Sequence, residues 1–148
     1  MKVAVACDHA GFGLKETVLN KIKALGHEAI DCGAPNTQRV DFPDYAAKAG
    51  ALLQNGQADR AVLICGSGIG MCIAANKLRG VYACVCHDAY SAHQGVEHDA
   101  MNALCLGALI IGKNLAEELV ERFLNASYFN EGNYKKRVDK ILALEAKI

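Results

Sequence analysis

The fold is decided by the stretch Ala61-Val62-Leu63-Ile64-Cys65-Gly66-Ser67-Gly68-Ile69-Gly70, in which an apolar run leads directly into alternate glycines. A continuous apolar run of this length is typical of a strand buried on both faces, as in a parallel sheet. The glycines predict a tight turn, and the residues from there to about Lys77 predict a helix. The stretch therefore predicts a strand, a turn and a helix, which is the repeating unit of an α/β fold.

The same unit recurs in both directions along the chain. We expect strands near residues 3–7, 28–32, 61–65, 81–86 and 103–106, with helices near 14–25, 43–54, 71–77, 90–96, 114–124 and 134–146. Asn114 and Glu117 have the spacing of an N-terminal cap for the helix near 114–124. Regular alternation of this kind predicts one domain, residues 1–148, with a parallel sheet covered by helices on both sides. The last helix has no strand to cover, and it packs either across a subunit boundary or on its own domain.

Composition and charge narrow the class of protein. A chain of 148 residues suits one domain and is too short for a full (β/α)8 barrel, which needs about 250 residues. Sixteen basic and sixteen acidic residues give a formal net charge of zero, which argues against a general nucleic-acid binder. There is no secretory h-region and no apolar run near the ~20 residues that span a bilayer. Together with seven cysteines, these features predict a cytoplasmic protein with reduced thiols.

Polar residues follow the predicted strands at the places where a parallel sheet binds ligands, the carboxyl ends. They include Asp8-His9 after the first strand and His87-Asp88 after the fourth, but residues 65–70 are the most informative. The glycines there let backbone N–H groups approach an oxyanion or phosphate, and a helix N-terminus favours a thiolate. Cys65 is thus a candidate base or nucleophile. The alternative is a tight strand-to-helix turn with an incidental buried cysteine.

Other patterns carry less information. The G-x-G-x-G spacing is not the dinucleotide-binding G-x-G-x-x-G, and no Gly-Lys-Ser/Thr follows to make a P-loop. His98 lies in a polar stretch before the fifth strand. It is either a general acid or base or an ordinary loop histidine. Cys84, Cys86 and His87, with His93 and His98 nearby, lack the second ligand pair of a standard metal site. We therefore interpret these cysteines as core residues and expect no metal.

Several segments together resemble one family of sugar-phosphate isomerases. They are residues 7–11, 41–46, 64–70, 73–77 and 90–92, His98 with Asn102, and Arg137 with Val138. In order, and over essentially the whole chain, they resemble the ribose-5-phosphate isomerase B and galactose-6-phosphate isomerase family. The resemblance implies a Rossmann-like three-layer α/β/α sandwich with a five-stranded parallel sheet. It also implies a homodimer or tetramer whose active sites draw on both subunits, and an aldose–ketose isomerisation that needs no metal or cofactor.

The resemblance also implies a role for individual residues. Met71 stands where one branch of the family has a glutamate base, so the chain resembles the branch in which a cysteine, here Cys65, is the base. His98 would open the sugar ring, and Ser67 would assist proton movement between the sugar oxygens. The implied substrate-binding residues are Gly66, Gly68, Ile69 and Gly70 for the oxyanion, Asp8 and Asp41 for hydroxyls, and His9, Asn102 and Arg137 for the anion. Asp99 replaces the family's usual asparagine, and it either repels the enediolate or binds a hydroxyl.

Two departures concern the phosphate. Leu109 and Asn133 stand where the family usually has arginines, leaving Arg137 as the matching one. Arginine makes bidentate, charge-assisted contacts with phosphate, so binding should be weaker without them. The leading hypothesis is interconversion of ribose 5-phosphate and ribulose 5-phosphate. The alternatives are the same chemistry on a different or non-phosphorylated sugar, and a non-catalytic sugar-binding or thiol-redox protein on the same fold.

Overall fold

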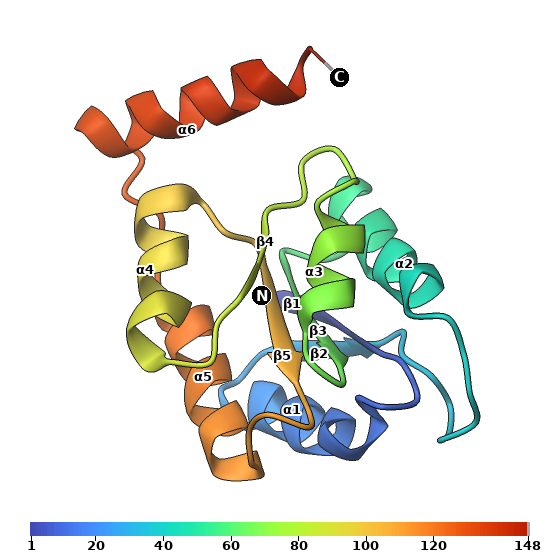
Figure 1. Ribbon diagram of the computed structural model, residues 1–148. Coiled ribbons are helices and arrows are strands. Elements are labelled where there is room, and N and C mark those ends of the chain that lie inside the picture. Colours follow the sequence, from blue (N-terminus) through green and yellow to red (C-terminus); the bar gives the residue numbers. More distant parts are fainter. Residues whose placement is uncertain (148) are drawn as a thin grey trace.

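Five parallel strands form the central sheet of the computed structural model, which describes residues 1–147 (Figure 1). The strands are β1 (Lys2–Cys7), β2 (Glu28–Asp31), β3 (Arg60–Cys65), β4 (Ala83–Val85) and β5 (Ala103–Gly107), in the spatial order β2-β1-β3-β5-β4. The three inner strands are buried along almost their whole length, whereas the edge strands β2 and β4 are partly exposed. This confirms the parallel sheet that the continuous apolar runs predict.

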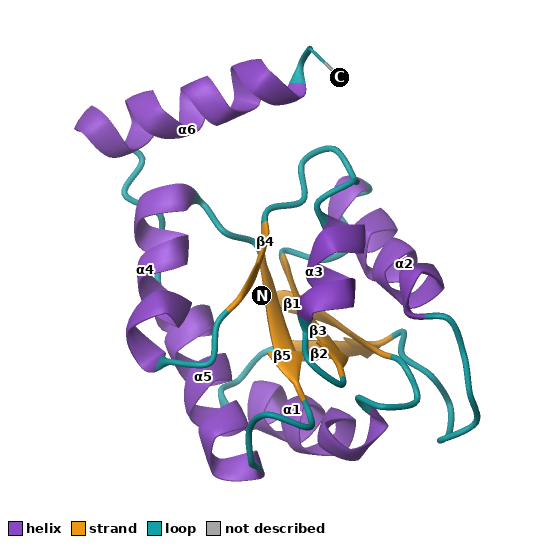
Figure 2. Ribbon diagram, in the orientation of Figure 1, coloured by secondary structure: helices purple, strands orange, loops and turns teal. Residues whose placement is uncertain are grey.

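Helices cover both faces of the sheet (Figure 2). They are α1 (Phe12–Ala24), α2 (Phe42–Gln54), α3 (Ile69–Ala75), α4 (Ala89–Asp99), α5 (Lys113–Asn125) and α6 (Gly132–Glu145). The apolar sides of α1, α4 and α5 form one core with the sheet, and those of α2 and α3 form the other. The three-layer α/β/α sandwich is therefore confirmed.

The last helix, α6, lies outside these layers and across one end of the molecule (Figure 1). It contacts α4, and Val138 is its buried residue. Ile141, Leu142 and Leu144 are exposed large apolar side chains on the same helix. Within residues 1–147, no helix is both long and apolar enough to cross a membrane.

The edge strand β4 is shorter than the predicted 81–86. It begins only at Ala83, because side chains take the backbone N–H groups just before and at its start. Tyr82 N donates to Asn102 Oδ1 at 2.8 Å, and Ala83 N donates to Asn76 Oδ1 at 2.9 Å. After Val85 the chain leaves the sheet toward α4, so Cys86 lies beyond the strand.

Two helix boundaries also differ from the prediction. The helix predicted at 90–96 extends to Asp99, so His98 lies in its last turn rather than in a loop. The helix predicted from Asn114 begins at Lys113, with extended Gly112 in the N-cap position and no side-chain cap. The cap predicted at Asn114 is therefore wrong, because that residue already lies inside the helix.

Candidate active site

The carboxyl ends of three neighbouring strands meet at one edge of the sheet. Cys7 at the end of β1 pairs with Ile64, and Cys65 at the end of β3 pairs with Gly107 at the end of β5. The connections that follow the neighbouring strands β1 and β3 run over opposite faces, since α1 and α3 belong to different cores. In open α/β sheets a crevice forms at such a switch point, so this edge is where a ligand is expected.

Residues 65–68, which we call the catalytic loop, bring a backbone N–H group to a buried sulfur. Cys65 is 5% exposed, and its Sγ accepts the N–H of Gly68 at 3.2 Å. Ile69 N donates to Ser67 Oγ at 3.3 Å. Gly68 has a φ of 80°, a conformation that favours glycine, and its Cα faces the backbone of Leu106 closely. The loop thus holds a thiol and a hydroxyl beside the N-terminus of α3.

Asp8 is held against the end of β3. It is 6% exposed, its Oδ1 accepts the N–H of Gly11 at 2.9 Å, and its own N–H donates to Ile64 O. A Cβ at Gly11 would collide with the carbonyl oxygen of Ile64, so only glycine permits this close approach. The carboxylate of Asp8 is therefore fixed within the strand ends that also carry Cys65.

His9 and Asp41 are tied to the same edge by the segment that precedes α2. The N–H of Val40 donates to His9 Nδ1 at 3.2 Å, which places the proton of a neutral ring on Nε2. Asp41 is the exposed N-cap of α2, but its side chain makes no capping hydrogen bond. Its carboxylate is thus not committed to the helix. The ring of Phe42 fills the space that a Cβ at Gly70 would occupy, at 2.9 Å.

The segment after β5 forms an apolar wall on the catalytic loop. Ala108 N donates to Cys65 O at 2.8 Å, and Leu109 N donates to Gly66 O at 3.0 Å. The Leu109 side chain is 80% exposed, and its Cδ1 would lie 3.2 Å from a Cβ at Gly66. An apolar side chain therefore stands over the loop.

The remaining predicted residues lie at the other edge of the sheet. His98 and Asp99 end α4, Asn102 directly precedes β5, and Arg137 is exposed on α6. Gln94 Nε2 lies 2.7 Å from His98 Nδ1, and the ring of Tyr134 lies 4.5 Å from the His98 ring, centroid to centroid. Tyr134 and Arg137 line a groove of about 480 Å³ at the start of α6.

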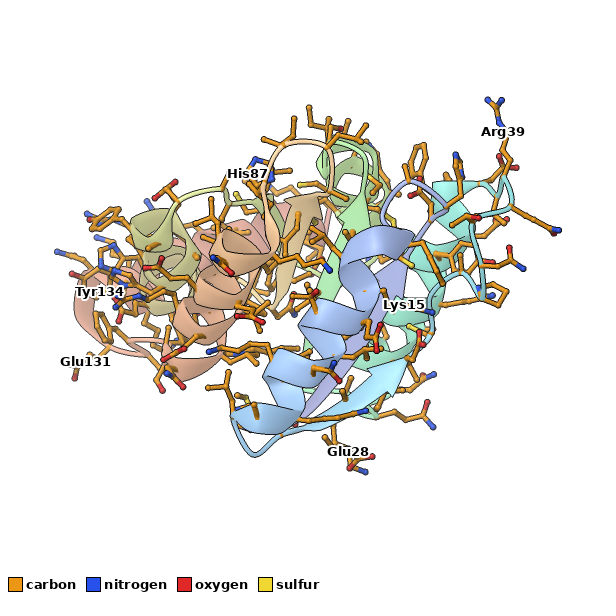
Figure 3. All side chains as sticks on the ribbon, turned by 90° about the horizontal axis from the view of Figure 1, so that it is seen from below. Lys15, Glu28, Arg39, His87, Glu131 and Tyr134 are labelled. Carbon is orange, nitrogen blue, oxygen red and sulfur yellow. The ribbon has the colours of Figure 1, made fainter. Side chains whose placement is uncertain are left out.

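The structure therefore divides the predicted site into two groups. We call Asp8, His9, Asp41 and residues 65–70 the carboxyl-edge group, and His98, Asp99, Asn102 and Arg137 the amino-edge group. Helix α4 runs back from the carboxyl edge, and the nine steps from Ala89 to His98 rise about 14 Å along its axis. Figure 3 likewise shows Tyr134, beside His98, far from His87 at the carboxyl edge. One chain brings the first group together but does not bring the second group to it.

Asn102 makes contacts of a structural kind. Its Oδ1 accepts the N–H of Tyr82, and its Nδ2 donates to Gly80 O, both at 2.8 Å. These bonds fix the loop before β4 to the start of β5. The contact of Asn102 with an anion stays a prediction.

Sequence reasoning missed the residues that support the site. One of them is Gln94, and its i, i+4 spacing from His98 on a helix was a signal that could have identified it. Phe42, next to Asp41, and Tyr134, beside His98, gave no comparable local signal. His87 was noticed at a strand end, but its partner could not be read from the sequence.

The thiols near the site differ in acidity. A hydrogen bond from Cys105 lowers the pKa of Cys72, on α3, to about 7. The same bond, with burial, raises the pKa of Cys105. Burial raises the pKa of Cys32 to about 11. Within residues 1–147, no three His, Cys, Asp or Glu side chains are grouped so as to hold a metal ion.

Comparison with known proteins points to one family. The family profile described as Ribose/Galactose Isomerase matches residues 3–141. Ribose-5-phosphate isomerase B of Escherichia coli (strain K12) is 39% identical over 144 residues, which cover 97% of this chain and 96% of that protein. A 4-deoxy-4-sulfo-D-erythrose isomerase of Clostridium sp. (strain MSTE9) is 40% identical over 129 residues, which cover 86% and 81%. The solved structure of Clostridium thermocellum ribose-5-phosphate isomerase B matches with a TM-score of 0.95 and 38% identity over 99% of both chains.

Proposed function

Because the chain belongs to the ribose/galactose isomerase family and is thus an aldose–ketose isomerase of sugar phosphates, we propose that it interconverts ribose 5-phosphate and ribulose 5-phosphate. The observation that carries this proposal is the catalytic loop, in which Cys65 Sγ accepts a backbone N–H beside the Ser67 hydroxyl. A base and a set of N–H donors around one small space suit proton transfer through an enediolate. The reaction needs no metal and no cofactor.

In the proposed mechanism, the Cys65 thiolate takes the proton from C2 of the open aldose. The electron pair of the broken C–H bond forms the C1–C2 double bond, and the enediolate oxygens accept N–H groups of Gly66 to Gly70. Ser67 passes a proton between O2 and O1. Cys65 then returns its proton to C1, which gives the ketose. Asp8 and Asp41 bind sugar hydroxyls, and His9 contacts the anionic end.

We propose further that the complete site forms between two copies of the chain. His98 opens the sugar ring and Arg137 binds the anion in this scheme, yet about 14 Å of α4 separates His98 from the edge that holds Cys65. Groups that act on one substrate must lie within hydrogen-bond reach of it, roughly 3 Å. A partner whose amino-edge group faces the carboxyl-edge group would supply them. The exposed Ile141, Leu142 and Leu144 of α6 would be covered in such a homodimer.

A second candidate keeps the chemistry and changes the acid group or the sugar. Leu109 gives the carboxyl edge an apolar wall where a cation would suit phosphate, and Asn133 is neutral at the groove near Arg137. A relative 40% identical to this chain carries the name of a sulfo-tetrose isomerase. A sulfonate carries one negative charge, so it needs fewer cationic partners than a phosphate dianion. A sulfonated tetrose or a non-phosphorylated sugar is therefore the alternative substrate.

A substrate comparison with purified protein tests both candidates. Ribose 5-phosphate, free ribose, erythrose 4-phosphate and 4-deoxy-4-sulfoerythrose would be compared by kcat/KM for ketose formation, with Cys65→Ala as the blank. Highest kcat/KM on ribose 5-phosphate, with competition by inorganic phosphate, supports the first candidate. Preference for the sulfonated or non-phosphorylated sugar, with weak competition by phosphate, supports the second. A wild type that forms no ketose above the enzyme-free rate from any of these sugars would reject both.

A further inference from the structure

His87 completes the sheet at the point where the edge strand β4 ends. The last bond between the two strands runs from Cys86 N to Cys105 O. In a parallel pair, alternate residues of β5 turn their N–H groups toward β4, so the next N–H in need of a partner is that of Gly107. That N–H donates to His87 Nε2 at 2.9 Å. The imidazole thus replaces the strand carbonyl that is missing there.

Gly107 of β5 packs closely against the catalytic loop. It pairs with Cys65 in the sheet, and a Cβ on it would lie 2.8 Å from both the carbonyl carbon and oxygen of Ser67. The next two residues, Ala108 and Leu109, donate their N–H groups to Cys65 O and Gly66 O. A shift of Gly107 would therefore be passed directly to the base and to the hydroxyl beside it.

We propose that His87 is a positioning residue that holds the end of β5 against the catalytic loop. This inference rests on the proposed function, since the loop is what carries the chemistry. His87 would act through Gly107, whose N–H its Nε2 accepts. The accepted N–H also requires that the proton of the neutral ring lie on Nδ1. Figure 3 shows His87 next to the loop that follows β5.

Two substitutions at this position separate the hydrogen bond from the bulk of the side chain. In His87→Leu the acceptor is lost while an apolar group fills the space. In His87→Gln the Oε1 atom takes a place similar to that of Nε2 and can accept the same N–H. The matched control is His93→Leu, which removes a different half-buried histidine, one that lies on α4. Circular dichroism establishes that each variant is folded.

The expected result is a loss in kcat for His87→Leu of about 10- to 100-fold, since small misplacements of catalytic groups have effects of this size. KM should stay near the wild-type value, and His87→Gln should restore most of kcat. Wild-type kcat in His87→Leu, or an equal loss in folded His87→Gln, would overturn the inference.

Hydrogen exchange gives a second readout that does not depend on activity. The Gly107 amide should be protected in wild type and in His87→Gln, and it should exchange faster in His87→Leu. Unchanged exchange in His87→Leu would also overturn the inference. If the wild type isomerises no sugar, but the three proteins still differ in Gly107 exchange as expected, the proposed function is rejected. The hydrogen bond between His87 and Gly107 is then still supported.

Discussion

The two edges of the sheet are built in different ways. At the carboxyl edge, Asp8 and Cys65 are buried, and backbone N–H groups or short loops fix them. At the amino edge, Arg137 is exposed, and His98 is held by the amide of Gln94 and by the ring of Tyr134. The first edge has the rigidity that proton transfer needs. The second has polar groups without a complete site around them, which is why we assign them to the active site of a second copy.

Replacement of Cys65 is the largest effect that we expect. Cys65→Ala should lower kcat by about 100- to 10,000-fold, the range for loss of a general acid or base. It should leave the circular dichroism spectrum unchanged. Cys84→Ala, at an exposed position on the edge strand, is the control and should keep normal kcat. A Cys65→Ala enzyme with normal turnover would mean that the base lies elsewhere.

Mixing two inactive variants decides whether the two edges meet across chains. Cys65→Ala and His98→Ala are each nearly inactive in the proposed mechanism. In a mixed dimer, one of the two sites would combine an intact Cys65 with an intact His98. Random exchange of subunits after mild denaturation should therefore restore about a quarter of wild-type activity, because half of the dimers each regain one site. Activity that stays at the level of the separate variants would show that a single chain supplies both residues.

The choice of sugar isolates the function of His98. Phosphorylation at C4 blocks the hydroxyl that would close a five-membered ring, so erythrose 4-phosphate has no such ring to open. His98→Ala should lower kcat/KM for ribose 5-phosphate by about 100-fold and change that for erythrose 4-phosphate by no more than about threefold. An equal loss on both sugars would assign His98 to the proton transfer or to binding instead.

Loss of Asn102 should mainly affect stability. Asn102→Ala leaves Tyr82 N and Gly80 O without their side-chain partners. It should lower the free energy of unfolding by about 1–3 kcal/mol, measured by urea denaturation. Asn20→Ala, at an exposed position on α1, is the control. If Asn102→Ala instead keeps its stability and raises KM for the phosphorylated sugar, the residue binds the anion.

Periodicity and glycine placement predicted most of the fold. The apolar runs that became β1, β3 and β5 are buried on both faces, so the sequence needs no alternation there and the signal is strong. The sequence signal for the edge strand β4 is weaker, because Asn76 and Asn102, which are distant from one another in the sequence, determine where this strand begins. Such contacts leave no local pattern.

The candidate site was predicted less evenly than the fold. Residues 65–70 carry their geometry in the sequence, since Gly68 permits the turn that brings its N–H to Cys65. For His98 and Asn102, one topological rule was available: a residue that directly precedes a parallel strand lies at the amino edge. That rule places both of them opposite Cys65. The contact between His87 and Gly107 depends on the spatial order of β4 and β5, which the chain order does not reveal.

The few contacts of α6 make it the first part of the chain to be lost. An isolated helix of 14 residues is marginal in water, and this one buries a single side chain against its own protomer. In the proposed homodimer, dilution below the concentration at which the partner covers α6 would let this helix unwind and expose the preceding segment to proteases. Cleavage there would remove Arg137 but leave the sandwich intact, so a clipped chain would stay folded while it loses the contact that we propose between Arg137 and the anionic end of the sugar.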